Sequence, residues 1–360
     1  MEQKLLSIVI PSYNMEAYLG RCVSSLLSLE PAELAKTEII VVNDGSKDNT
    51  SGVAHSFRLQ CPDVVRVIDK ENGNYGSCVN CGLASAQGKY VKILDADDWF
   101  DAEAYATFVG RLQALDVDLV VTDFNQVDAD GHVSNASHFC GKYEGVMATL
   151  KQEMGYWPMH SLCYRTEMLR EHRYEQTTGI SYTDTEWAII PLLYVKQFSF
   201  VPVTLYQYFV GRDGQTMDAA VLFNRRTHLI KTLTKCIDWI NRERQNGPVS
   251  PYVEGRLNLT ISFLYFTLLV DNRGKACPEL VEFDKYLERN AGFAYRKLDK
   301  DVLGDASQFH FIRAWRNSHY VMPEMSLICR FRVFVHKCRI HARWLWETKV
   351  RHKSQNEIDT

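Results

Sequence analysis

Three carboxylates follow a short apolar run of the chain. The run 91–94 predicts a buried strand, and Asp95, Asp97 and Asp98 come directly after it. Like charges crowded at the end of a strand repel one another unless a cation offsets them, and Mg²⁺ or Mn²⁺ accepts such oxygen ligands. The segment therefore predicts a site for Mg²⁺ or Mn²⁺. The alternative is a turn in which Asp98 or Asp101 caps the next helix.

The composition is that of a soluble globular protein. The 360 residues are 46% hydrophobic and 24% charged, and the net charge of -3 gives no reason to expect nucleic acid as a partner. The first apolar run is too short for a secretory signal, so a cytoplasmic location is expected. The ten cysteines are scattered, which indicates reduced thiols. Cys78 and Cys81 form a C-x-x-C that we expect to pack in a helix, with redox chemistry or half a zinc site as the alternative.

Strands and helices alternate in the first part of the chain. Apolar runs at 5–10, 39–42 and 64–68 are each followed by a polar turn and a helical pattern, and the first run is expected to stop at Pro11. This order predicts an α/β fold with a mostly parallel central sheet and helices on both faces. The polar turns then meet at the carboxyl edge of the sheet, where nucleotides bind in such folds.

Asp44 lies at the same edge, in the turn after the second strand. A carboxylate there can accept the N3 hydrogen of a uracil while Tyr13 packs against the ring. A plain Asp-Gly turn with Gly45 is the alternative. The segment 72–76 after the third strand is expected to be a flexible loop at the same site.

Four motifs at these turns resemble those of the family 2 inverting glycosyltransferases, which have the GT-A fold. They are Ser-Ile-Val-Ile-Pro-Ser-Tyr-Asn (7–14), Glu-Ile-Ile-Val-Val-Asn-Asp-Gly-Ser (38–46), Asn-Gly-Asn-Tyr-Gly (72–76) and Leu-Asp-Ala-Asp-Asp-Trp (94–99). The resemblance implies a GT-A catalytic domain, which we place at 1–220. It also implies a hexosyltransferase that uses a nucleotide-sugar donor, usually a UDP-sugar.

The resemblance also implies which residues form the site. Asp95 and Asp97 would be the Asp-X-Asp pair, with Asp97 nearest the metal ion, and Asp44 would contact the base. The other residues implied at the nucleotide-sugar site are Pro11, Tyr13, Asn14, Asn72, Gly73, Gly76 and Ala96. Family members often carry a basic residue just before an Asn-X-Gly, where this chain has Val79.

A second polar segment, 179–187, opens an apolar helix that is expected to continue through Leu193. Inverting sugar transfer requires a base for the acceptor hydroxyl, and a carboxylate beyond the metal pair must supply it. In the resembled family an acidic pair stands at this point, and its Asp is the base. Asp184 is the counterpart here, with Glu186 in reserve. Capping of the helix by Thr183 or Asp184 is the alternative.

The loop 211–216 follows a strand predicted at 198–205 and places Arg212 between two glycines. Such a loop can close over a diphosphate, with Arg212 as its charge partner. An exposed arginine in a surface turn is the alternative. Some members of the resembled family carry a similar Gly-Arg-X-Gly-Gln loop. The Gln-X-X-Arg-Trp signature of processive polysaccharide synthases is absent, so addition of a single sugar is expected.

The last part of the chain, 221–360, is predicted to be helical. Its helical patterns cover 221–245, 252–270 and 279–290. The run 257–270 is expected to be too short to span a bilayer. The segment 325–353 interleaves basic and aromatic residues, which predicts peripheral binding to anionic lipid on the inner face of the cell membrane. A helix packed on the protein is the alternative, and RNA binding is a weaker one, since no recognised module is present.

Together these features predict a metal-dependent inverting glycosyltransferase of polysaccharide or glycoconjugate biosynthesis, with a saccharide or lipid-linked acceptor. Two other classes stay open: a non-catalytic nucleotide-sugar-binding protein of the same fold, and a nucleotidyltransferase. The latter is expected to have a basic glycine-rich first loop, and residues 11–14 contain neither glycine nor lysine. The sequence does not specify the sugar, the acceptor or the oligomeric state.

Overall fold

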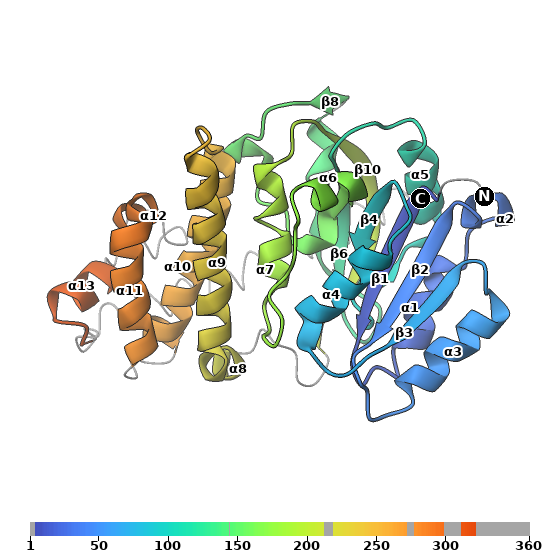
Figure 1. The fold of residues 1–360 in the computed structure, drawn as a ribbon, viewed down its shortest axis with the longest axis horizontal. Coiled ribbons are helices and arrows are strands. Elements are labelled where there is room, and N and C mark those ends of the chain that lie inside the picture. Colours follow the sequence, from blue (N-terminus) through green and yellow to red (C-terminus); the bar gives the residue numbers. More distant parts are fainter. Residues whose placement is uncertain (1–3, 144, 212–218, 272–276, 299–310, 322–360) are drawn as a thin grey trace, which may run out of the picture. The chain divides into compact units, whose positions relative to one another are not determined.

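A computed structural model describes residues 4–143, 145–211, 219–271, 277–298 and 311–321 (Figure 1). These residues divide into two compact units. The first contains the described residues up to 211 together with 242–253, and the second contains 219–241 and the described residues from 254 onwards. Arg212 and the segment 325–353 lie outside the described residues, so the roles given to them stay predictions from the sequence.

The first unit is built on one mixed sheet, whose strands lie in the order β3, β2, β1, β4, β9, β6, β10 and β5. The bounds are β1 Leu6–Ser12, β2 Thr37–Asn43, β3 Val65–Asp69, β4 Tyr90–Ile93, β5 Trp99–Phe100, β6 Leu119–Val127, β7 Val133–Ser137, β8 Val146–Met147, β9 Leu162–Arg165 and β10 Phe198–Phe209. Strands β3, β2, β1 and β4 are parallel, as are β6 and β10, whereas β9 is antiparallel to both of its neighbours. The predicted α/β fold with a mostly parallel sheet is confirmed.

Helices pack on both faces of the parallel strands. Their bounds are α1 Leu19–Leu26, α2 Pro31–Leu34, α3 Thr50–Gln60, α4 Asn74–Ser85, α5 Ala102–Leu112, α6 Thr166–Glu171 and α7 Asp184–Trp187. Side chains of β1 alternate between the faces, so Ile8 packs in the core with α1 and α5. Val9 points the other way, where a Cβ added to Gly82 of α4 would lie 2.3 Å from its Cγ1. Covering on both faces explains why β1 and β2 are buried along their whole length.

Strand β1 does not stop at Pro11 as expected but continues through Ser12. Up to Val9 it pairs with both β2 and β4, and beyond that residue only with β2. The Val9 carbonyl accepts the Leu94 N–H (3.0 Å) and so faces β4. The backbone N–H and C=O groups of residues two positions apart point to the same side of a strand. Position 11 therefore faces the β4 side, where β4 has already ended, and the N–H that proline lacks has no partner to lose there. No ladder hydrogen bond is lost.

Three other boundaries differ from those expected. Helix α4 begins at Asn74 inside the supposed flexible loop, because the Gly73 N–H is held by the Asp44 carboxylate (2.9 Å). Strand β10 runs on to Phe209, because its end pairs with both β6 and β5. Helix α7 ends early, and a 3₁₀ turn, Pro191–Leu193, follows it, because proline has no N–H to continue an α-helix.

The second unit is helical, as the sequence predicts. The bounds are α8 Ala219–Asn224, α9 Arg226–Arg244, α10 Pro251–Phe266, a π-helical turn Thr267–Asp271, α11 Pro278–Asn290, α12 Gly292–Lys297 and α13 Phe311–Asn317. The end of α9 and the start of α10 are grouped with the first unit.

One helical run in the described residues, Pro251–Val270, is long and apolar enough by composition to cross a membrane. The run 257–270 that was expected to be too short to span a bilayer is the later part of this longer helical run, so the expectation for the run itself is not tested. Buried residues make up 61% of its apolar window, and core helices of soluble proteins pass the same test.

Candidate active site

The aspartates after β4 are held by the end of β10. Asp98 is fully buried, its Oδ2 accepts a hydrogen bond from the Tyr206 hydroxyl (2.6 Å), and its Oδ1 accepts one from the Phe209 N–H (2.7 Å). The same hydroxyl accepts the Asp95 N–H (3.1 Å). The phenol thus bridges the backbone of Asp95 and the side chain of Asp98. The residue that caps α5 is Asp101, not Asp98.

Replacing Tyr206 by phenylalanine is expected to lower the free energy of unfolding by about 1–3 kcal/mol, because the buried Asp98 carboxylate loses its O–H donor. Tyr208→Phe is the matched control on the same strand, since no residue in the described ranges hydrogen-bonds to its hydroxyl. Urea denaturation of both variants measures the difference. Equal losses in the two variants would contradict the bridging role of Tyr206.

Arg21 fixes the backbone between these aspartates. Its Nη2 donates to the Asp97 carbonyl oxygen (2.9 Å). Its guanidinium lies over the ring of Trp99 (3.7 Å from Cζ to the ring centroid) and near that of Phe209 (4.9 Å). Cation–π contacts of this kind contribute about 0.5–2 kcal/mol. Sequence reasoning did not identify Arg21, because the contact joins α1 to a loop 76 positions away.

The carboxylates after β4 repel one another. The pKa of Asp98 is raised well above its ordinary value, mainly by burial and then by the charges of Asp95 and Asp97. The hydrogen bonds from Tyr206 and Phe209 act in the opposite direction. A bound cation would offset this repulsion. Carboxylate oxygens gathered in this way fit a divalent ion.

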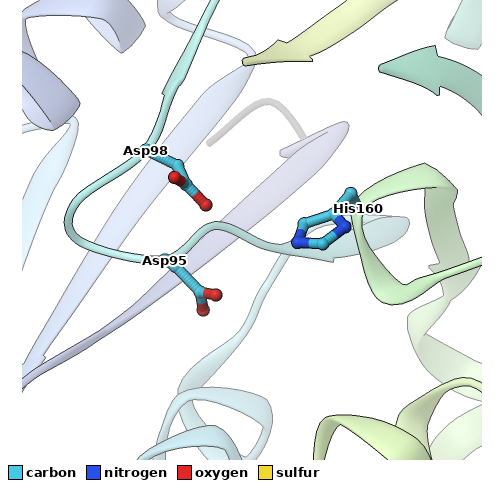
Figure 2. Close-up of side chains that lie close together, drawn as sticks. All are labelled: Asp95, Asp98 and His160. Atoms are coloured by element: carbon cyan, nitrogen blue, oxygen red, sulfur yellow. The ribbon is translucent and has the colours of Figure 1, made fainter. Parts of the chain in front are cut away.

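His160 lies close to two of these carboxylates, those of Asp95 and Asp98. Ligand atoms of Asp95, Asp98 and His160 all lie within 4.8 Å of one another (Figure 2). Burial and the charge of Lys92 lower the pKa of His160 to about 3, so the imidazole is neutral at physiological pH. The structure therefore groups Asp95 with Asp98 and His160, and Asp97 does not belong to that group. The predicted role of Asp97 as a metal ligand stays a prediction.

Lys92 is a buried cation that holds the backbone of His160. It points from β4, and its Nζ donates to the carbonyl oxygens of His160 (2.6 Å) and Leu162 (3.4 Å). Burial lowers the pKa of Lys92 to about 8. A lysine within an apolar run gave no sign of this role, because its partners come from a segment about 70 residues further along.

Asp44 follows β2, which is separated from β4 by β1, and it is almost fully buried. Its Oδ1 accepts hydrogen bonds from Lys70 Nζ (2.6 Å) and from the Gly73 N–H (2.9 Å). The side chain of Asn72 donates to the Asp44 carbonyl oxygen (2.9 Å). The structure thus brings together Asp44, Asn72 and Gly73 as expected and adds Lys70. Tyr13, at the end of β1, is 41% exposed.

The remaining residues implied at the nucleotide site lie along the same edge. The Asn14 N–H donates to Ser46 Oγ (3.0 Å) and its Oδ1 accepts the Lys47 N–H (2.8 Å), which joins the loops after β1 and β2. Asn14 has a φ of 54°, which asparagine tolerates better than most residues. Pro11 and Ala96 are buried, and Ala96 belongs to the hydrophobic core.

Helix α4 also holds the segment that leads to Asp184. Asn80 Nδ2 donates to the Gln176 carbonyl oxygen (2.8 Å), and its Oδ1 accepts the Gln176 N–H (2.7 Å). A Cβ added to Gly76 would lie 2.2 Å from the Thr177 carbonyl oxygen, so glycine is needed for this close approach. The loop expected to bind the donor is therefore in direct contact with the segment before Asp184.

Asp184 and Glu186 have different environments. Glu186 is fully buried, and its Oε2 accepts the Thr177 N–H (2.9 Å), so it positions this segment. Asp184 is half-buried. The pKa of Tyr75 is raised well above its ordinary value by burial, then by the charges of Asp95 and Asp184. The Tyr75 hydroxyl also donates to Asp95 Oδ1 (2.8 Å). Tyr75 therefore lies close to both carboxylates.

Tyr208 is close to the same charges. Burial raises its pKa, and the charges of the three aspartates after β4 and of Asp184 add to the effect. Coulombic effects fall with distance, so these carboxylates are gathered around one part of the sheet edge. The helix-capping alternative is not supported for Thr183, whose side chain makes no capping hydrogen bond.

The chain is similar in sequence to known glycosyltransferases. The sequence model of glycosyl transferase family 2 matches residues 7–174. The chain is 30% identical over 166 residues to the glycosyltransferase GlyG of Streptococcus pneumoniae, a match that covers 45% of this chain and 54% of GlyG. The chain spans about half the length of the curated relatives it matches first.

Two solved structures share the fold. Staphylococcus aureus TarS 1–349 in complex with UDP-GlcNAc superposes with a TM-score of 0.64 at 18% identity, covering 88% of this chain and 89% of that chain. The mannosyltransferase PcManGT of Pyrobaculum calidifontis, in complex with GDP-Man and Mn²⁺, gives a TM-score of 0.50 at 16% identity, covering 89% and 88%. Residues 7–174 therefore belong to glycosyltransferase family 2, in a domain of GT-A fold.

Proposed function

We propose that this protein is a metal-dependent inverting glycosyltransferase that moves one sugar from a UDP-sugar to a hydroxyl group of a saccharide or lipid-linked acceptor. The observation that supports the proposal is that the charges of Asp95 and Asp184 both raise the pKa of Tyr75, whose hydroxyl donates to Asp95 Oδ1 (2.8 Å). A carboxylate that could act as the base and one that could hold the ion thus both influence the same tyrosine. Transfer of this kind suits polysaccharide or glycoconjugate biosynthesis.

Each carboxylate has a separate role in this proposal. Asp44 accepts a hydrogen bond from the base of the nucleotide, and Asp95 and Asp97 hold the ion. When bound, the divalent ion would neutralise the charge of the departing diphosphate. Asp184 takes the proton from the acceptor hydroxyl. The oxygen of that hydroxyl attacks the anomeric carbon of the donor sugar from the side opposite the leaving group. Attack from that side inverts the configuration at the anomeric carbon.

The donor is proposed to be a UDP-sugar because the buried Asp44 carboxylate can accept the N3 hydrogen of uracil. The TarS structure is in complex with UDP-GlcNAc, whereas PcManGT is in complex with GDP-Man, so members of this fold differ in their base.

Adding UDP with Mn²⁺ or Mg²⁺ is expected to raise the melting temperature, because a ligand that binds only the native state stabilises it, by about 2.7 kcal/mol at 100 times Kd. Thermal unfolding with UDP or GDP, with and without metal, measures this effect, and GDP is the matched control for the base. If no nucleoside diphosphate shifts the melting with or without metal, the nucleotide site is wrongly assigned. If UDP does raise the melting temperature, a panel of UDP-sugars, tested for hydrolysis, would identify the sugar.

A further inference from the structure

The imidazole of His160 points from the turn before β9 toward the two carboxylates after β4 (Figure 2). One ligand atom from each of Asp95, Asp98 and His160 lies within 4.8 Å of the other two. Distances of about 2.0–2.6 Å from an ion to its ligands allow ligand atoms to be up to roughly 5 Å apart. The three side chains can therefore surround a single ion without rearrangement of the backbone.

His160 is held in place by contacts that leave its ring nitrogens available. The ring packs on Tyr208 (4.6 Å between centroids), Tyr206 (4.7 Å) and Phe124 (5.2 Å). Lys92 holds its carbonyl oxygen. The buried Nδ1 has no hydrogen-bond partner among the residues that the structure describes. No such bond fixes the tautomer of the ring, so either nitrogen can present its lone pair.

We infer that His160 supplies a nitrogen ligand to the divalent ion held at Asp95, an inference that rests on the proposed metal-dependent function. The Asp-X-Asp pair by itself offers only oxygen ligands, which suit Mg²⁺ as well as Mn²⁺. An imidazole ligand binds first-row transition ions better than Mg²⁺. The residue that selects Mn²⁺ over Mg²⁺ in this protein is then His160, from a segment outside the Asp-X-Asp motif.

Electron spin-echo spectroscopy of the full chain with Mn²⁺, with and without UDP, tests the inference directly. A bound histidine nitrogen adds a ¹⁴N modulation to the Mn²⁺ signal, and we expect this modulation in the unmodified protein. His160→Phe keeps an aromatic ring against the three neighbouring rings and should abolish the modulation. Its Mn²⁺ affinity should fall by at least about tenfold, a loss typical of disturbed metal sites. Its Mg²⁺ affinity should change much less.

The control variant is His132→Asn. His132 lies with Asp128 and Asp130 in an exposed cluster that also has ligand-like spacing, so it reports binding of Mn²⁺ outside the site. The modulation should persist in this variant. Bound Mn²⁺ that shows no ¹⁴N modulation in the unmodified protein would overturn the role of His160 and leave the proposed function intact. Failure of Mn²⁺ to bind, even with UDP, would overturn both. If His160→Phe does not fold, the spectrum of the unmodified protein and the His132→Asn control decide the question.

Discussion

Asp184→Asn is expected to lower the rate of sugar transfer by about 10²–10⁴-fold, the usual contribution of a positioned general base. Asparagine has nearly the same size and still forms hydrogen bonds, but it cannot accept the proton of the acceptor hydroxyl. The charges of Asp184 and Asp95 both act on Tyr75, while Asp44, the residue proposed to bind the base, lies at the end of another strand. Binding of UDP should therefore persist in the variant.

Transfer kinetics and UDP binding, both measured on Asp184→Asn, test this prediction. Glu186→Gln is the matched control, because glutamine keeps an oxygen that can accept the Thr177 N–H. We expect this control to retain most of its activity. Unchanged turnover in Asp184→Asn would remove Asp184 from the mechanism. If the unmodified protein binds UDP but neither transfers nor hydrolyses any donor, the non-catalytic binding protein becomes the better interpretation.

The largest effect on stability is expected for Asp284, in the second unit. Asp284 is fully buried on α11 and accepts hydrogen bonds from Arg316 of α13 (2.6 Å from Nη2, 3.0 Å from Nε) and from the Tyr265 hydroxyl of α10 (2.6 Å). Asp284→Ala leaves the guanidinium without its counter-charge. Removing one partner of a buried ion pair lowers the free energy of unfolding by about 3–5 kcal/mol.

Hydrogen exchange of the amides in α11 and α13 measures this loss where it occurs, because opening of a local unit lowers protection there first. Glu282→Ala is the control on the same helix, since its ion pair with Lys285 (3.0 Å) is exposed and should contribute less than about 1 kcal/mol. Replacing Asp284 and Arg316 together by leucine should recover much of the stability. Equal protection of the α11 and α13 amides from hydrogen exchange in Asp284→Ala and Glu282→Ala would contradict the stabilising role of the buried Asp284–Arg316 ion pair.

Much of the fold could be predicted from the sequence, because local patterns carry it. Apolar runs followed by polar turns and helical patterns predict parallel βα units, and the ends of parallel strands must share one edge. For this reason the order of the residues alone places Asp44, Asp95 and the glycines near Asn72 at one edge. The wrong predictions concerned the ends of strands and helices. At Pro11, for example, the missing N–H would end the strand only if β4 were still paired with β1 there.

The contacts that organise the site could not be predicted in the same way. Lys70, Arg21, Lys92 and His160 carry no motif, and their partners come from other turns of the chain or from other strands. The resemblance to family 2 glycosyltransferases implied Asp97 as the partner of Asp95. The path of the loop also brings Asp98 near Asp95, because the Tyr206 hydroxyl binds both residues. Strand order and the packing of distant segments set these distances, and neither is encoded in the spacing of nearby residues.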